Sequence, residues 1–308
     1  KNFAGLSRLK VKGAPGTRIT LKHGELLKTD GRLEQGNIDV YYHPVKPGEV
    51  FQMDVFTLKG TGEEEIFMPS FAYHGFQHVE VESSAPVVLT KESLTGLFMH
   101  TAVEPVGSFS CSDPLLNKIW KATMEAYRSN LHSIPTDCPQ REKNGWTADA
   151  HVAIDLGLLG FDAITLYEKW MNDFCDEQKD NGILPCIIPT SVWGYDWANG
   201  GDWTSAVAII PWEIYRFYGD TTLLRRMYGP IKKYVSYIES ISTNHLTDWG
   251  LGDWIPVRSK SNITLTSSIY YYTDVCILAK AARLFGYAED ASYYNTLCLL
   301  YTSPSPRD

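Results

Sequence analysis

The chain has 308 residues, of which 44% are hydrophobic and 21% charged, an ordinary composition for a folded protein with room for two domains. Its formal net charge of -8 at pH 7 disfavours nucleic acid or an anionic membrane as the main partner, and no apolar run reaches the roughly 18 residues that a membrane span requires. Aromatic residues are numerous, with 9 Trp, 18 Tyr and 12 Phe, which suits a sugar-binding cleft or a large hydrophobic core.

Up to about residue 105, apolar and polar residues alternate with the period of half-buried strands. Four segments follow this pattern, at residues 18–23, 50–58, 76–82 and 87–90. Turn residues separate them, at Gly13, Pro15-Gly16, Pro47-Gly48 and Gly60. Short alternating strands joined by turns predict an antiparallel β-sandwich over residues 1–105, and nothing in this part of the chain suggests catalysis.

From Ser112 onward the apolar period becomes helical. Ser112 is a candidate N-cap for a helix with Pro114 near its first position, and an apolar stripe follows from Leu115 to Tyr127. Further helices are expected at about residues 149–159, 163–178, 203–218, 221–240 and 267–285, with another beginning near residue 288. Long helices joined by loops rich in Trp, Gly and Asp predict a helical barrel or toroid over residues 106–297, with a cleft built by the loops at one end.

The segment from Asp137 to Asp149 concentrates three carboxylates, two cations and a tryptophan in thirteen residues. Pro139 and Gly145 interrupt any helical period, so a polar loop between helices is expected. Carboxylates beside an aromatic platform are what a carbohydrate-cleaving site needs. The alternative is a solvated loop in which Asp149 merely caps the next helix.

Three later loops repeat the same residue types. They are Trp193-Gly194-Tyr195-Asp196-Trp197 with Gly200-Gly201-Asp202-Trp203, then Asp248-Trp249, then Gly252-Asp253-Trp254. Carboxylates accept hydrogen bonds from sugar hydroxyls, and indole rings cover the apolar face of a sugar. For a single loop, capping by Asp and packing by Trp would be the simpler explanation; three of them beside the 137–149 loop favour a shared binding cleft.

The six cysteines show neither CxxC pairs nor clustering with histidine, so buried free thiols are expected rather than disulfides or a zinc site. The eight histidines are scattered, and neither His74 nor His132 belongs to a recognisable ligand spacing. No metal and no cofactor is therefore expected.

The run from Thr136 to Asp149 resembles the signature of bacterial α-L-rhamnosidases of glycoside hydrolase family 78. Three other runs are similar to that family: Tyr167–Asp173, Ile209-Ile210-Pro211-Trp212 and Phe71–Phe76. The resemblance covers nearly all of residues 1–297. It implies a rhamnosidase-associated, concanavalin-like β-sandwich followed by the N-terminal half of an (α/α)6-barrel catalytic domain.

The resemblance also implies roles for individual residues. Glu142 matches the general acid that protonates the glycosidic oxygen. The residues that match or accompany the substrate-binding set are Asp137, Arg141, Trp146, Asp149, Asp202, Trp203 and Trp254. A general acid must hold its proton at the working pH, so we expect Glu142 to lie beside Asp137 and Asp149, with at least one of its two cationic neighbours directed elsewhere.

The family inverts anomeric configuration and so needs a second carboxylate to activate water. No position before residue 297 matches that base, and we expect it further along the natural protein. Residues 298–308 resemble an in-frame translation of a sequencing-library adapter, so they and Cys298 are expected to be non-native. The chain starts without Met and shows no signal peptide, which suggests that it begins inside a longer protein.

The expected substrates are α-L-rhamnosides, from plant polysaccharides or rhamnosylated natural products. Resemblance further implies work in the periplasm or outside bacterial cells. Two alternatives remain open: an inverting hydrolase of another sugar on the same toroid, and a carbohydrate-binding protein without catalysis. The complete set of Asp137, Glu142 and Asp149 disfavours the second, because a binding protein needs no acid at the scissile bond.

Overall fold

The computed structural model describes residues 1–39 and 51–299, so the expected Pro47-Gly48 turn and most of the expected tail lie outside the described residues. The chain forms two compact units. We call the first the sheet unit, comprising Lys1–Ala102, Phe109–His132 and Thr136–Lys143. We call the second the helical unit, comprising Val103–Ser108, Ser133–Pro135 and the chain from Asn144.

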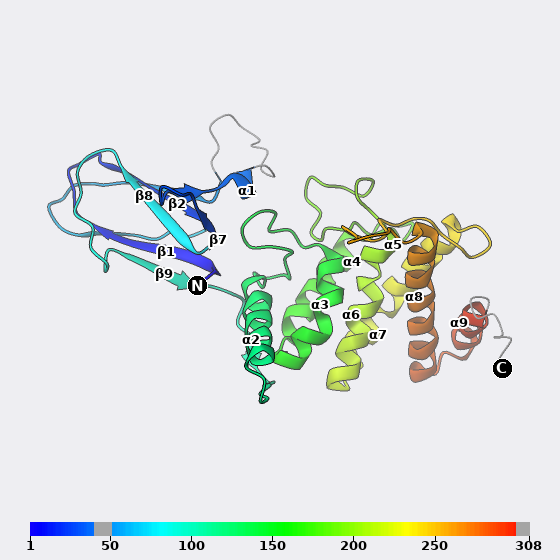
Figure 1. Ribbon diagram of the computed structural model, residues 1–308. Coiled ribbons are helices and arrows are strands. Elements are labelled where there is room, and N and C mark those ends of the chain that lie inside the picture. The colour runs from blue at the N-terminus through cyan, green and yellow to red at the C-terminus, as the bar shows by residue number, and fades with distance from the viewer. Residues whose placement is uncertain (40–50, 300–308) are drawn as a thin grey trace. The chain divides into compact units, whose positions relative to one another are not determined.

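Two antiparallel sheets make up most of the sheet unit (Figure 1). In the first, β1 (Phe3–Val11) pairs with β6 (Glu65–Phe67), β7 (His74–Phe76) and β9 (Leu94–Phe98). In the second, β2 (Arg18–Gly24) lies between β5 (Met53–Thr57) and β8 (His78–Ser83). Alternate residues of β1 and β2 are buried, and one hydrophobic cluster joins the sheets through Leu9, Val11, Ile19, Leu21 and Leu58.

The strand predictions were right for β2 and for most of β5. The segment 76–82 is divided between β7 and β8 at Gln77, whose amide donates to the Gly24 carbonyl. The prediction of a strand at 87–90 was wrong: Val88 is 80% exposed, and the Thr90 amide donates to the Ser93 hydroxyl in a turn. Strands β1 and β9 were not predicted from the sequence. They pair closely: Gly5 of β1 lies so near the Leu97 carbonyl of β9 that a Cβ on Gly5 would collide with it.

The sheet unit also contains the helix α2 (Pro114–Ser129) and, near residue 36, the short α1 (Gly36–Asp39). The N-cap of α2 is Asp113, not Ser112, because the Asp113 carboxylate accepts the Leu115 amide. The apolar stripe expected on α2 is exposed at its start, with Leu115 at 61%. Tyr127, near the end of α2, is buried.

The helical unit carries the remaining helices. They are α3 (Thr147–Gly160), α4 (Ile164–Glu177), α5 (Gly201–Thr204), α6 (Ala206–Tyr218), α7 (Thr222–Ile241), α8 (Ile263–Phe285) and α9 (Ala288–Leu299). Successive members pack as pairs, α6 on α7, α7 on α8 and α8 on α9, while α3 packs on α6 (Figure 1). Gly219 and Gly286 adopt left-handed conformations that end α6 and α8, as a C-terminal cap requires.

Short strands complete the chain: β3 (Leu26–Leu27) pairs with β4 (Leu33–Glu34), and β10 (Glu104–Pro105) pairs with β11 (Phe161–Asp162). The six cysteines all fall in the described residues and are free thiols as predicted, although only Cys186 is buried. Among the described helices, none combines the length and the apolar character needed to cross a membrane.

Candidate functional site

The helical unit contains a cavity of about 350 Å³ at the ends of three helices. Its wall includes Asp149 of α3, Asp202 and Trp203 of α5, Asp253 and Trp254 of the loop between α7 and α8, and Tyr270 of α8. The structure therefore brings together four of the residues singled out from the sequence: Asp149, Asp202, Trp203 and Trp254. Side chains far apart in the chain converge here on a small polar and aromatic space, as in a ligand site.

Asp149 lies in the first turn of α3 and is exposed. The N-cap position is Trp146, which makes no side-chain capping bond, so Asp149 is not the cap that the simpler explanation required. The helix start is fixed instead by backbone pairing, in which the Thr147 amide donates to the Cys186 carbonyl and the Ile188 amide to the Gly145 carbonyl. A Cβ on Gly145 would collide with the Ile188 carbonyl, so the close approach needs glycine.

Asp202 is buried, and its carboxylate holds the loop that follows α7. Its oxygens accept the backbone amides of Leu251, at 2.9 Å, and Gly252, at 2.6 Å. Burial raises the pKa of Asp202, while these amides act in the opposite direction. Because Gly252 lies two residues before Trp254, Asp202 fixes the backbone that presents that indole.

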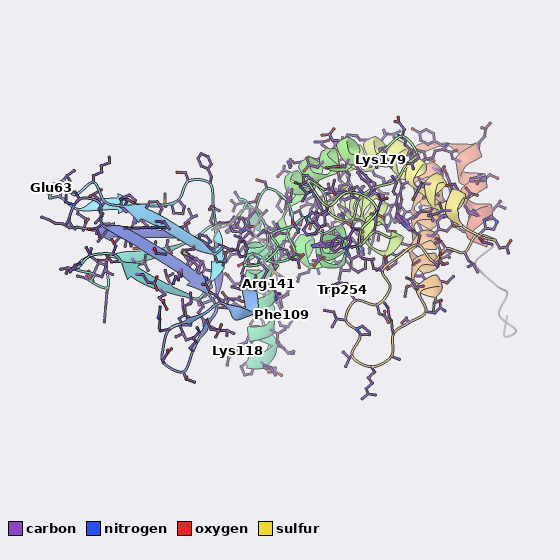
Figure 2. The ribbon with its side chains drawn as sticks, turned by 90° about the horizontal axis from the view of Figure 1, so that it is seen from above. Glu63, Phe109, Lys118, Arg141, Lys179 and Trp254 are labelled. Atoms are coloured by element: carbon purple, nitrogen blue, oxygen red, sulfur yellow. The ribbon has the colours of Figure 1, made fainter. Side chains whose placement is uncertain are left out.

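The two indoles of the cavity differ in exposure. Trp203 is 8% exposed and Trp254 is 71% exposed, and their rings meet edge to face with centroids 6.0 Å apart. Trp254 lies on the loop between α7 and α8 (Figure 2). Trp146, assigned to the same subsite from the sequence, does not line this cavity; its ring lies 6.1 Å from that of Trp197.

Two residues that sequence reasoning missed support the cavity. His151 of α3 is buried, and its Nε2 lies 3.0 Å from the Asp202 carbonyl; burial lowers the pKa of His151, so a neutral ring donates there. Tyr270 meets the His151 ring edge-on at 5.5 Å, and burial raises the pKa of its hydroxyl. His151 lies two positions beyond Asp149, just outside the run from Thr136 to Asp149 that resembles the family signature, and this proximity is the available signal.

Asp137, Arg141 and Glu142 belong to the sheet unit, where Pro139–Glu142 form a turn. Cys138 organises this turn: its carbonyl accepts the Lys143 amide, its sulfur accepts the Glu142 amide, and its thiol donates to the Asp137 carboxylate. Burial, aided by the charge of Asp137, raises the pKa of Cys138 to about 11, so the thiol keeps the proton that it donates. Glu142 is exposed, and Arg141 is half-buried at the surface of the turn (Figure 2).

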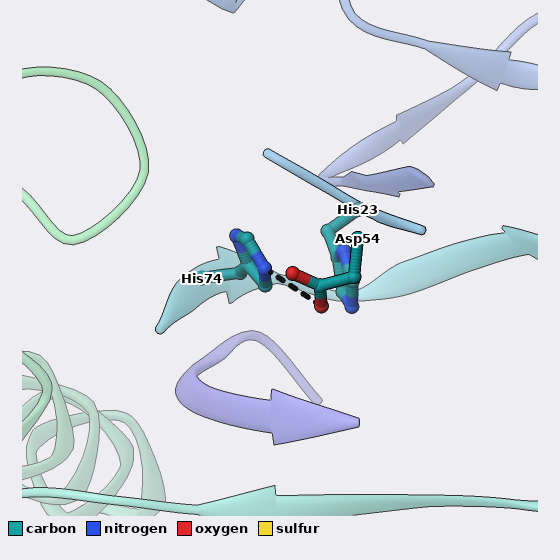
Figure 3. A group of neighbouring side chains, drawn as sticks. All are labelled: His23, Asp54 and His74. Carbon is teal, nitrogen blue, oxygen red and sulfur yellow. Dashed lines mark hydrogen bonds and ion pairs between the residues drawn. The ribbon is translucent and has the colours of Figure 1, made fainter. Parts of the chain in front are cut away.

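A buried cluster in the sheet unit, His23, Asp54 and His74, has the residue types of a metal site (Figure 3). Its rings do not fit one: His23 and His74 stack with centroids 4.0 Å apart and 19° between their planes. Imidazole lone pairs lie in the ring plane, so two nearly parallel rings cannot direct them at one ion. Hydrogen bonds account for the cluster instead.

In that network His74 bonds Asp54 at 3.0 Å and the Gln52 side-chain oxygen at 3.1 Å. The Gln52 amide nitrogen donates to the Gly75 carbonyl, so its oxygen must accept from His74. His23 lies against Ser7 and the Gln52 carbonyl, and burial, followed by the charge of His74, lowers the pKa of His23 to about 3. A neutral His23 therefore packs on the hydrogen-bonded His74–Asp54 pair.

Sequence comparison identifies both parts of the chain. The family described as the bacterial alpha-L-rhamnosidase concanavalin-like domain matches residues 1–100, and the bacterial alpha-L-rhamnosidase 6 hairpin glycosidase domain matches residues 104–299. An alpha-L-rhamnosidase of Streptomyces avermitilis is 31% identical over 300 residues, which cover 96% of this chain and 28% of that protein. An alpha-L-rhamnosidase from Alteromonas sp. (strain LOR) is 28% identical over 316 residues, which cover 96% of this chain and 32% of that protein.

Solved structures agree. An alpha-L-rhamnosidase from Dictyoglumus thermophilum superposes with a TM-score of 0.87 at 37% identity, covering 97% of this chain and 33% of that one. The Streptomyces avermitilis enzyme complexed with L-rhamnose gives a TM-score of 0.85 at 30% identity, covering 97% of this chain and 28% of that one. The chain thus spans about a third of the length of these relatives, with a sheet domain followed by a helical hairpin glycosidase domain, and it belongs to the bacterial α-L-rhamnosidase family.

Proposed function

We propose that the protein containing this chain is an inverting glycoside hydrolase that removes terminal α-L-rhamnose from plant polysaccharides or rhamnosylated glycosides. One observation carries the proposal: in a member of this family, Asp149, Trp203 and Trp254 line one cavity of about 350 Å³. That volume suits a single sugar ring, with a carboxylate for its hydroxyls and an exposed indole for its apolar face.

In the proposed mechanism Glu142 is the general acid. It donates its proton to the glycosidic oxygen as the bond to the leaving group breaks. Asp137, Arg141 and Asp149 bind sugar hydroxyls. Trp254 forms an aromatic wall of the cavity, and Trp146, which does not line that cavity, forms an aromatic wall outside it. Asp202 acts through its two amide bonds to the 251–252 backbone, which set the position of Trp254.

A second carboxylate must activate the water that attacks the anomeric carbon from the opposite face. We place this base beyond residue 297 of the natural protein, which agrees with a chain that spans about a third of its relatives. We further propose that residues 1–105 are a rhamnosidase-associated sandwich, that residues 106–297 contribute the first half of an (α/α)6 barrel, and that the protein acts in the periplasm or outside the cell.

The test is rhamnose release by the complete reading frame that contains this chain, comparing the parent with Glu142→Gln. Two α-L-rhamnosides are used, one with an activated aryl leaving group and one with an alkyl leaving group. The variant should lose about 100-fold to 10,000-fold with the alkyl glycoside, because proton donation contributes that much. The loss with the aryl glycoside should be smaller, since an acidic phenol leaves with little help.

Glu63→Gln is the matched control, because Glu63 is also an exposed glutamate of the sheet unit. It should retain parental rates with both substrates. Equal activity of Glu142→Gln and the parent on the alkyl glycoside would remove Glu142 from the acid role. A folded parent that releases another sugar but no rhamnose would overturn the substrate assignment, and sugar binding without turnover would favour a binding protein.

A further inference from the structure

The turn that carries Glu142 is packed directly on strand β7 of the sheet unit. Gly75, in the middle of β7, has no side chain, and the backbone of Pro139 and Gln140 occupies the space. A Cβ built on Gly75 would lie 2.9 Å from the Gln140 amide nitrogen and 2.9 Å from the Pro139 carbonyl carbon. No rotamer change relieves contacts with backbone atoms, so the glycine is needed for this approach.

Lys143, the residue after Glu142, ties the other side of the turn to the same sheet region. Its ammonium donates to the Tyr73 carbonyl at 2.6 Å and lies 4.6 Å from the Tyr73 ring centroid and 5.1 Å from that of Phe51. Its backbone has φ of 56°, in the left-handed region that a long side chain rarely adopts. A non-glycine residue holds that conformation only where its surroundings enforce it, and here the side-chain contacts do so.

The sheet side of this attachment is itself held firmly. The Tyr73 ring stacks on His132 with centroids 3.8 Å apart. The Gly75 carbonyl accepts the Gln52 side chain, whose oxygen faces His74, and His74 bonds Asp54. The buried His23–Asp54–His74 cluster thus lies behind the strand on which the turn rests. Burial lowers the pKa of Lys143 to about 8, and the charge of Asp54 only partly opposes this shift.

We propose that Lys143 and Gly75 are positioning residues, through which the sheet unit fixes the backbone that carries Glu142 for proton donation. The inference rests on the proposed role of Glu142 and adds that the β-sheet unit takes part in placing the acid. Lys143 acts by its side-chain contacts with Tyr73 and Phe51, and Gly75 by leaving room for the turn.

The test uses the complete reading frame with Lys143→Met, Lys143→Arg and Gly75→Ala. Rates with the alkyl rhamnoside should fall about 100-fold in the Met and Ala variants, because a misplacement of about 1 Å costs that much. Rates with the activated aryl rhamnoside should fall less than about 10-fold, since that bond needs less proton donation. Lys143→Arg, which keeps a cationic donor, should recover most of the alkyl activity.

Hydrogen exchange of the peptide covering residues 136–143 gives a second readout that does not depend on catalysis. Exchange should be faster in Lys143→Met and Gly75→Ala than in the parent. Lys179→Met and Gly229→Ala are matched controls: Lys179 lies 3.8 Å from the Tyr195 ring centroid in the helical unit (Figure 2), and a Cβ on Gly229 meets nothing within 4 Å. Both should leave rates and exchange at 136–143 unchanged.

Equal losses of rate with the two leaving groups would overturn the proposal, because a general loss of stability lowers both rates alike. Unchanged hydrogen exchange at residues 136–143 would also overturn it, because the contacts of Lys143 and Gly75 would then not be needed to hold the turn. A parent that releases no rhamnose would overturn the proposed function and the catalytic half of this inference. Faster exchange in Lys143→Met would even then establish the anchor itself.

Discussion

At the scale of single residues, the candidate sugar site depends on carboxylates with different tasks. Asp149 is exposed in the first turn of α3, does not occupy its N-cap, and lines the cavity. Asp202 is buried and holds two backbone amides. A buried carboxylate satisfied by amides is a good structural anchor, whereas an exposed carboxylate in the cavity wall can reach a ligand's hydroxyls. The same residue type therefore provides an accessible cavity-wall group at one position and the scaffold at another.

We predict that Asp202→Asn weakens rhamnose binding mainly through Trp254. The Asp202 carboxylate accepts two backbone amides, whereas an Asn side chain has only one oxygen that can accept them. Each hydrogen bond to a charged group contributes about 1.5–3 kcal/mol to stability. The loop at Leu251 and Gly252 should loosen, and KM for an aryl rhamnoside should rise about 10-fold with kcat changed less. Trp254→Ala should produce a similar rise.

The double variant decides the mechanism. If Asp202 acts through Trp254, the effects of Asp202→Asn and Trp254→Ala will overlap, and the double variant will resemble Trp254→Ala alone. Fully additive losses would show that Asp202 contacts the sugar by a separate route, and the scaffold role would then be abandoned.

Much of this site could be predicted from the sequence because its residues form recognisable local patterns. Asp202-Trp203 and Asp253-Trp254 place a carboxylate beside an indole in glycine-rich loops, and such pairs were recognised. Tyr270 was not, because it opens a run of three tyrosines on α8, of which Tyr271 is fully buried. Choosing among consecutive helical positions needs the rotation of the helix against its neighbours, and that is set by packing rather than by local sequence.

At the scale of elements, α8 shows what local signals fix and what they leave open. It was expected from residue 267 but begins at Ile263, because the Asn262 side chain accepts the Thr264 and Leu265 amides and starts the helix one turn earlier. Its end was predicted correctly at Phe285, before a left-handed Gly286. The tertiary environment of its middle could not be predicted: Asp274 is fully buried there, where its carboxylate accepts the Ser205 hydroxyl at 2.6 Å.

Asp274 predicts a pH dependence of stability for the helical unit. Burial raises the pKa of Asp274 well above its ordinary value of 3.8, and the Ser205 bond only partly opposes this. In the pH range between 3.8 and the raised pKa, the native state holds a proton that the unfolded state has released. The contribution of this proton to the unfolding free energy is thus complete below pH 3.8 and is lost as pH rises through the native pKa.

Asp274→Asn should remove this slope, since an amide is neutral at every pH and can still accept from Ser205. Chemical denaturation followed by circular dichroism from about pH 5 to about pH 9 should show a midpoint that falls with pH in the parent and stays level in the variant. Asp180→Asn, at a fully exposed side chain, is the control and should keep the parental slope. A parental midpoint that rose with pH would contradict the assignment of a protonated Asp274.

At the scale of the whole molecule, a change of sequence period near residue 105 predicts where strands give way to helices. The two family models match residues 1–100 and 104–299. The two compact units formed by packing do not divide the chain at residue 105. Helix α2 and the 136–143 segment have helical or loop sequence, yet they belong to the sheet unit. Periodicity reports local structure only, so it could not show that the Glu142 turn is assembled on β7.

We therefore predict that residues 1–143 form a more stable folding unit than residues 1–105. The longer fragment keeps the hydrogen bond from the Thr101 amide to the Leu131 carbonyl, at 2.7 Å, and the stacking of Tyr73 on His132. It also keeps the hydrogen bond from Lys143 to the Tyr73 carbonyl and the packing of Gln140 against Gly75. The shorter one exposes these sheet surfaces to water.

Thermal unfolding of the two fragments, with matched termini and buffer, measures the difference. Loss of about 1 kcal/mol shifts the Tm of a domain of this size by roughly 4–8 °C, so residues 1–143 should melt at least about 5 °C higher. Lys143→Met and Gly75→Ala in the longer fragment should remove part of that gain, because each breaks one attachment of the turn. Equal midpoints for the two fragments would mean that the sheets are complete without α2 and the turn, and the domain boundary would return to residue 105.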